Sequence, residues 1–197
     1  MAGDTTVVLV AAPDHDVVGG IRSLLIDDYR VRTTTDGEEA LARLDGADVV
    51  LVDRDLQAEA GTVVATEIDR RAGSHSIAVM CSADREFESR RIAGDCLVKP
   101  VDETDLRGTV DRLARRARYE ELMAECATLA ARRGALEAHT RDDPDDEEYA
   151  AVQRRLGELF DELDELVAAF DGEDFRAAFT ACDYATDSGA QRVQRFS

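Results

Sequence analysis

Five short apolar runs, each followed by a stretch with helical spacing of its apolar residues, occupy the first half of this chain. The runs show little alternation of polar and apolar residues, which is typical of strands buried on both faces of a parallel sheet. Because strand and helix patterns alternate, the sequence predicts an α/β fold: a doubly wound five-stranded parallel sheet with helices on both faces. The predicted strands are Thr6–Ala11, Tyr29–Thr34, Asp48–Val52, Ile77–Cys81 and Cys96–Val98.

Acidic residues mark the starts of the predicted helices. Asp36 and Glu39 resemble a capping box. Asp105 places negative charge in the first turn of a helix that begins near Asp102, where it stabilises the helix dipole. The four earlier helices are predicted over residues 15–27, 37–45, 61–72 and 84–93.

Beyond residue 105 the pattern is helical only. One apolar stripe runs from Tyr119 to Leu136, and a second runs from Tyr149 to Phe170 with steps of three and four residues. An acidic segment with Pro144 at its centre separates them and predicts a turn. We therefore expect an antiparallel α-helical hairpin, whose stripes pack on each other or on a second copy of the chain.

These patterns divide the chain into three predicted parts. Residues 1–117 form the α/β domain, residues 118–185 form the helical hairpin domain, and residues 186–197 form a polar, flexible tail. The apolar stripes of the hairpin and the face of the helix after Asp102 are the surfaces that could form a homodimer.

The composition is strongly acidic and argues against nucleic acid as a ligand. The chain has 43 acidic and 24 basic residues and a net charge of -19, which repels phosphate backbones. An acidic excess with almost no lysine resembles proteins of salt-loaded, halophilic cytoplasm, where salt screens the repulsion between like charges.

One cluster of arginines could instead indicate a DNA-binding surface. Acidic residues interleave with it, which favours a charged solvent face with ion pairs along the helix. No helix-turn-helix pattern is evident, so we expect no direct DNA binding and predict protein contacts instead. The arginines are Arg112, Arg115, Arg116 and Arg118.

The cysteines form no spaced motif. They are far apart and read as free thiols in a reducing compartment. No apolar stretch approaches the ~20 residues that a bilayer requires, and no signal peptide opens the chain. We expect a cytoplasmic protein without membrane contact. The cysteines are Cys81, Cys96, Cys126 and Cys182.

Lys99 is the only lysine of the chain, among 24 basic residues. It ends the fifth predicted strand, while Asp53 ends the third and Ser82 ends the fourth. The carboxyl ends of parallel strands form the ligand-binding edge of such sheets, so these three side chains should meet. A carboxylate nucleophile with an ammonium and a hydroxyl group suits phosphoryl transfer to Asp53.

The segments around these residues resemble the receiver domain of two-component response regulators, over about residues 5–117. The resemblance is carried by Val49–Leu56 followed by Gly61, by Met80–Ala83 and by Leu97–Pro100. It implies a flavodoxin-like receiver fold and a response regulator of a two-component phosphorelay.

The resemblance also implies roles for single residues. Asp53 would be the phosphoacceptor and would take phosphate from a sensor histidine kinase. Ser82 would sense the phosphoryl group, and Lys99 would pair with it. Cys96 stands at the switch position, where many receivers have an aromatic residue.

Two further segments resemble haloarchaeal regulators in particular. Residues 28–41 are similar to their receivers, and residues 105–181 are similar to the helical HalX domain that follows those receivers. The resemblance implies signalling through the helical domain, with an output in transcription regulation through other signalling or transcription proteins.

The acidic pair with which receivers hold magnesium is absent here. It falls on Ala12 and Pro13, and the nearest carboxylate, Asp14, lies one position later. Mg²⁺ prefers oxygen ligands in octahedral order. We therefore expect only weak Mg²⁺ binding, through Asp14, Asp53 and Asp55.

Two other interpretations follow from the same residues. Without the metal, the chain could be a degenerate, phosphorylation-independent receiver that acts as a protein-interaction module. The order of these groups also resembles that of phosphohydrolases of the haloacid dehalogenase type, with Asp53 and Asp55 followed by Ser82 and Lys99. Those enzymes place their aspartate pair on the first strand, whereas two βα units precede Asp53, so we expect no enzyme.

Overall fold

The computed structural model describes residues 6–71, 76–82, 95–139 and 147–170, together with residues 172 and 174. The chain divides into two compact units, Met1–Ala117 and Arg118–Ser197. The helix predicted over residues 84–93, the acidic turn at Pro144 and the tail predicted over residues 186–197 lie outside the described residues.

Unit 1 is built on the predicted parallel sheet. Its strand order is β2-β1-β3-β4-β5, and every pairing is parallel. The order reverses at β1 and β3, which is the point where such sheets bind ligands. The strands are β1 (Val7–Ala11), β2 (Arg30–Thr34), β3 (Val49–Asp53), β4 (Ser76–Ser82) and β5 (Asp95–Lys99).

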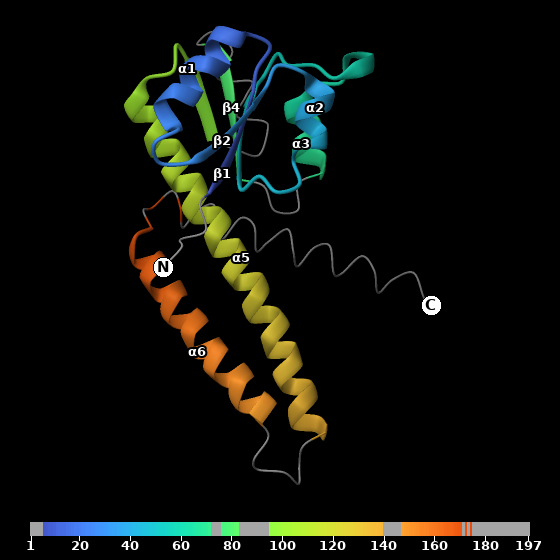
Figure 1. Ribbon diagram of the computed structural model, residues 1–197, viewed down its shortest axis with the longest axis vertical. Helices are drawn as coiled ribbons and strands as arrows, with labels where there is room; N and C mark the ends of the chain where they lie inside the picture. Colours follow the sequence, from blue (N-terminus) through green and yellow to red (C-terminus); the bar gives the residue numbers. More distant parts are fainter. Residues whose placement is uncertain are drawn as a thin grey trace. The chain divides into compact units, whose positions relative to one another are not determined.

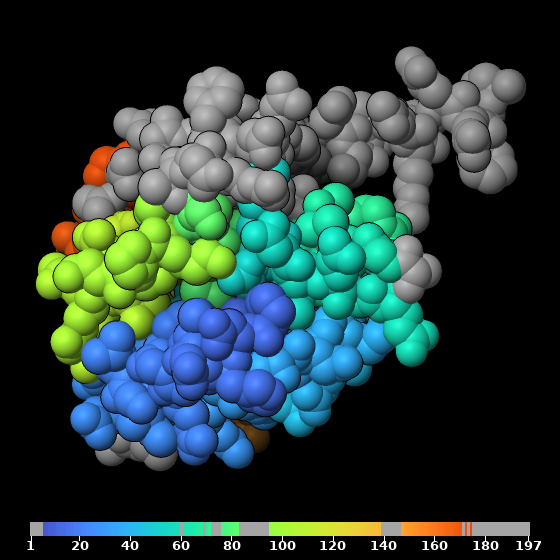
Figure 2. Space-filling view, turned by 90° about the horizontal axis from the view of Figure 1, so that it is seen from above, coloured from blue at the N-terminus to red at the C-terminus, as the bar shows by residue number. Residues whose placement is uncertain are grey.

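Helices cover both faces of this sheet, as predicted. Helices α1 and α5 pack on one face, and α2 and α3 pack on the other (Figure 1). Seen from above, the surface of α1, in blue, lies directly beside the yellow-green start of α5 (Figure 2). The helices of unit 1 are α1 (His15–Leu25), α2 (Gly37–Ala42), the short 3-10 helix η1 (Glu59–Gly61), α3 (Val64–Arg71) and the first part of α5 (Glu103–His139).

The two faces of the sheet bury separate cores, which explains why the strands show no polar alternation. Neighbouring residues of a strand point to opposite faces. Val8 and Val10 of β1 therefore pack with α1 and α5, whereas Leu9 and Ala11 pack with α2 and α3. All residues of β3 are buried, including Asp53 at its end.

Helix α1 ends two residues earlier than expected, at Leu25, and two other predicted helices are shorter by three residues or more. The helix predicted over residues 37–45 ends at Ala42, and Gly46 then turns the chain with a φ of 83°. The helix predicted over residues 61–72 begins only at Val64, because Gly61 has a φ of 75° and Thr62 is extended. Both corrections come from local backbone geometry that apolar spacing does not report.

The start of α2 is fixed by a cap and by a close backbone contact. The Asp36 carboxylate accepts a hydrogen bond of 2.8 Å from the Glu39 backbone N–H, as in the predicted capping box. A Cβ atom at Gly37 would lie 2.3 Å from the backbone oxygen of Gln57. Only glycine therefore fits at the first position of α2.

Unit 2 contains the later part of α5 and helix α6 (Glu147–Ala168). Leu122 and Cys126 of α5 pack against Leu159 and Leu163 of α6. The ring centroids of Tyr119 and Phe170 lie 5.6 Å apart at one end of this core. The two apolar stripes thus pack on each other.

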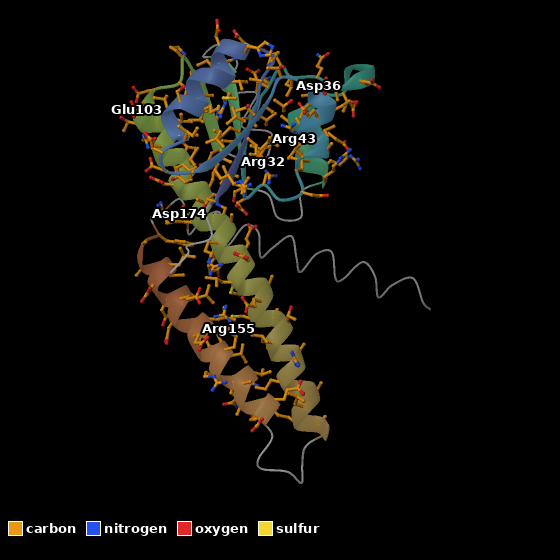
Figure 3. All side chains as sticks on the ribbon, in the orientation of Figure 1. Arg32, Asp36, Arg43, Glu103, Arg155 and Asp174 are labelled. Carbon is orange, nitrogen blue, oxygen red and sulfur yellow. The ribbon has the colours of Figure 1, made fainter. Side chains whose placement is uncertain are left out.

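Ion pairs between the helices show that they run antiparallel. Later residues of α5 pair with earlier residues of α6, as the predicted hairpin requires. Arg155 of α6 faces α5 (Figure 3). The ion pairs between α5 and α6 are Arg118 with Glu162 at 2.7 Å, Glu125 with Arg155 at 2.9 Å, and Arg132 with Glu148 at 2.5 Å.

Among the described residues, none of the helices is both long and apolar enough to cross a bilayer.

Candidate functional site

Asp53 is a buried carboxylate at the carboxyl end of β3. Its relative exposure is 2%, in a strand that lies between β1 and β4. Burial of a charged group is costly unless the group is paired and hydrogen-bonded. The surroundings of Asp53 must therefore supply both a countercharge and donors.

Lys99 supplies the countercharge. Its Nζ lies 2.8 Å from Oδ2 of Asp53, and the backbone N–H of Asp55 donates to Oδ1 at 2.9 Å. Each carboxylate oxygen thus accepts a hydrogen bond from a different group. The Lys99 side chain is 27% exposed, so the pair lies at the rim of the sheet and solvent reaches it from one side.

Ser82 stands beside this pair in the sheet. It ends β4 and pairs in register with Lys99, whereas Asp53 pairs with Met80, two residues earlier on β4. The Ser82 side chain is half-buried. The structure therefore brings Asp53 and Lys99 into contact and puts Ser82 on the neighbouring strand, next to Lys99. Their roles stay predictions.

The residues that precede α1 provide little for a cation. Ala12 is fully buried, and Pro13 is exposed. Asp14 caps α1, since its carboxylate accepts a hydrogen bond of 2.8 Å from the Asp16 backbone N–H. In the part of the chain that the structure describes, no group of three His, Cys, Asp or Glu side chains could hold a metal ion. Asp14 is thus engaged as a helix cap, and the weak Mg²⁺ binding expected from the sequence stays a prediction.

Cys96, at the predicted switch position, contacts a second cysteine. Its Sγ lies 2.9 Å from Sγ of Cys81. The sequence reading missed this contact because the two residues are fifteen positions apart and follow no known spacing. The register of the structure explains the contact: in parallel β4 and β5, Val79 pairs with Cys96, so Cys81 lies on the same face as Cys96.

Comparison with family models shows which protein family contains these side chains. Residues 8–111, more than half of the 197 residues, match the family model of the response regulator receiver domain. The chain belongs to the response regulator receiver family. The receiver is followed by a HalX domain, which matches residues 115–179.

A curated relative of this response regulator comes from Haloferax volcanii and bears the name "Putative transcriptional regulator". It is 35% identical over 135 residues, which cover 67% of this chain. The same residues are 23% of the relative, so the chain spans about a quarter of that protein's length.

Solved receiver structures share the fold. The response regulator receiver domain protein of Clostridium thermocellum is 21% identical with a TM-score of 0.51, over 57% of this chain and 97% of that chain. The signal receiver domain of an HD domain-containing protein of Pseudomonas fluorescens is 16% identical with a TM-score of 0.52, over 61% of this chain and 95% of that chain. At these identities the likeness concerns the fold alone.

The receiver and HalX domains together support a two-component response regulator. Membership in this family indicates a signalling role rather than a catalytic one. It favours the phosphorelay interpretation over a receiver that serves only as an interaction module.

Proposed function

We propose that Asp53 accepts a phosphoryl group from the phosphohistidine of a sensor histidine kinase. The observation that carries this proposal is the contact between the buried Asp53 carboxylate and Lys99, the only lysine of the chain. A single ammonium on a flexible stem can follow charge that moves from a carboxylate to an attached phosphoryl group, which a planar guanidinium does less well.

In the proposed step, a carboxylate oxygen of Asp53 attacks phosphorus while the bond between phosphorus and the histidine nitrogen breaks. The imidazole leaves with the electron pair of that bond. The product carries about -1.5 to -2 units of charge in place of one. Lys99 then pairs with a phosphoryl oxygen, and the Ser82 hydroxyl, on the neighbouring strand end, donates to another.

Lys99 has a second task before phosphorylation. It neutralises a carboxylate that is 2% exposed and holds it in one orientation together with the Asp55 backbone N–H. Weak Mg²⁺ binding through Asp14, Asp53 and the Asp55 carbonyl stays a prediction. No part of the proposed step depends on it.

The output would pass through the helical hairpin to other proteins of signalling or transcription. The name of the Haloferax volcanii relative and the HalX match support a role in transcription. The net charge of -19 favours protein contacts over direct DNA contacts. A homodimer in the cytoplasm is the form in which we expect the chain to act.

A small phosphodonor tests the proposal without the kinase. The full chain would be incubated with phosphoramidate in concentrated potassium chloride, with and without Mg²⁺, and the modified residue located by mass spectrometry. We expect one phosphoryl group on Asp53 and none in Asp53→Asn. Asp45→Asn, which changes an exposed aspartate of the same unit, is the matched control and should label like the natural sequence. Labelling that persists in Asp53→Asn, or none in the natural sequence under both conditions, would refute the proposal.

A further inference from the structure

A pair of cysteines lies next to the phosphoacceptor site. The Sγ atoms of Cys81 and Cys96 are 2.9 Å apart, and neither residue is part of a disulfide. Cys81 directly precedes Ser82 on β4, and Cys96 stands three residues before Lys99 on β5. The two thiols are therefore in contact between the strands that end in Ser82 and Lys99, and Lys99 pairs with Asp53.

The strand register sets the relation of the two thiols. Val79 pairs with Cys96, and Cys81 pairs with Val98, so the cysteines are diagonal neighbours on one face of the sheet. Diagonal neighbours are farther apart at the backbone than direct partners. The side chains nevertheless turn toward each other, which leaves the sulfur atoms in contact.

The two thiols differ in their access to small molecules. Cys81 is 1% exposed, whereas Cys96 is half-buried. Cys96 stands on β5, an edge strand of the sheet, whereas Cys81 stands on β4 between β3 and β5. A small reagent can therefore reach Cys96 more readily than Cys81.

We propose that Cys81 and Cys96 are a redox modification site. A low-molecular-weight disulfide oxidises the two thiols, which form a reversible disulfide bond with each other. The Cys96 thiolate attacks one sulfur of the reagent, whose S–S bond breaks and releases one small thiol. The Cys81 thiolate then attacks Cys96 Sγ in the mixed disulfide, and the second small thiol leaves. The two cysteines lose two electrons and two protons in total, and the reagent is reduced to two thiols.

Oxidation would change the geometry of the neighbouring strand ends. Bridged cysteines have Cβ atoms about 3.8 Å apart, which is closer than diagonal positions ordinarily allow. Ser82 and Lys99 would then shift relative to each other. An effect on phosphorylation depends on the proposed function, but disulfide formation does not. In reducing cells such bonds are transient and regulatory, in line with a switch rather than a structural bridge.

Peptide mapping tests the site directly. The reduced full chain would be exposed to 2-hydroxyethyl disulfide, a neutral reagent that the acidic protein does not repel, in concentrated potassium chloride. Free thiols would then be alkylated and the chain cut with trypsin. Trypsin places each cysteine on its own peptide, since arginines separate all four in the sequence.

We expect the peptide 72–85 linked to the peptide 92–107, with a loss of two of the four thiols and of the mass of two hydrogen atoms. Dithiothreitol should restore both thiols. Cys96→Ser should leave Cys81 reduced, whereas the matched control Cys126→Ser, which changes a buried cysteine of unit 2, should form the link as before.

Two results would overturn the proposal. One is a folded chain in which Cys96 remains a mixed disulfide with the reagent, while Cys81 remains a free thiol and is recovered in alkylated form. The other is that the free thiol of Cys126 is lost faster than the free thiol of Cys81. The experiment contains no phosphodonor, so its outcome is independent of whether Asp53 accepts phosphate.

Discussion

The Tyr29 hydroxyl donates a hydrogen bond to the carboxylate of Asp111, which joins the turn after α1 to α5 within unit 1. Burial and this hydrogen bond to an anion raise the pKa of Tyr29 well above its usual value of about 10. The neutral phenol is therefore the form that stabilises the fold.

Replacing Tyr29 with phenylalanine should lower the free energy of unfolding by about 1 kcal/mol at neutral pH, the ordinary contribution of one hydrogen bond. Since the folded pKa is raised, the contribution is complete below pH ~10 and is lost as the pH rises toward the folded pKa. Urea unfolding of the natural sequence and of Tyr29→Phe, from pH 7 to the most alkaline pH at which both still fold, measures this contribution. A difference that grows above pH ~10 would contradict it.

Lys99→Ala should strongly destabilise the receiver, because it leaves the Asp53 carboxylate buried without its countercharge. Breaking a buried pair costs about 3 kcal/mol or more, and the partial exposure of Lys99 places this case at the lower end. The double change Asp53→Asn with Lys99→Met removes both charges and should recover much of the loss. Urea unfolding compares the chains. Equal stability of the single and double variants would show that the pair is not coupled.

Gly37→Ala should destabilise the fold by about 1–3 kcal/mol, as overpacking does, since its Cβ would overlap the Gln57 backbone oxygen. Gly20→Ala is the control. A Cβ at Gly20 meets nothing within 4 Å, so helix propensity should stabilise α1 by about 0.5–1 kcal/mol. Opposite shifts of the melting temperature are expected, and a neutral Gly37→Ala would exclude the close contact.

Arg155→Ala should weaken the hairpin of unit 2, because Arg155 bridges α6 to Glu125 of α5. The Arg155 guanidinium lowers the pKa of Glu125, so the pair stabilises above the usual carboxylate pKa and loses this effect as the pH falls through the lowered one. The loss should be largest at low salt and shrink as salt screens the pair. Arg154→Ala, at an exposed neighbouring position, is the control. Thermal unfolding followed by circular dichroism at several salt concentrations checks this, and equal effects of the two variants would contradict it.

Pro13→Asp should raise the affinity for Mg²⁺, because it adds a carboxylate at an exposed position directly after the buried end of β1. Asp14→Asn should change the affinity less, since the Asp14 carboxylate already caps α1. Calorimetric titration of Mg²⁺ measures both. If Pro13→Asp binds no more tightly than the natural sequence, the missing acidic pair is not what limits the metal.

Apolar spacing predicted the sheet well because parallel strands are buried on both faces, and β3 is an uninterrupted example. It predicted the helix ends less well. Helix α2 ends at Ala42, before the turn at Gly46, and Gly61 with its positive φ precedes the start of α3 at Val64, although the apolar spacing continues in both places. The pattern beyond residue 105 was helical, but it did not show that a single helix, α5, runs from Glu103 to His139.

The meeting of Asp53 and Lys99 could be foreseen because parallel strand ends share one edge of a sheet. The contact of Cys81 with Cys96 could not, because it depends on the exact register of β4 and β5 and on side-chain rotamers. Strand positions follow from burial, whereas diagonal contacts require the register itself.

Because the only lysine pairs with Asp53, an isotope label on lysine would act as a spectroscopic probe of this site. Reductive methylation with carbon-13 formaldehyde would label Lys99 and, apart from the amino terminus, no other amine. Its methyl resonance would then report on the charge next to it, and through that on every molecule or ion that reaches the Asp53 carboxylate.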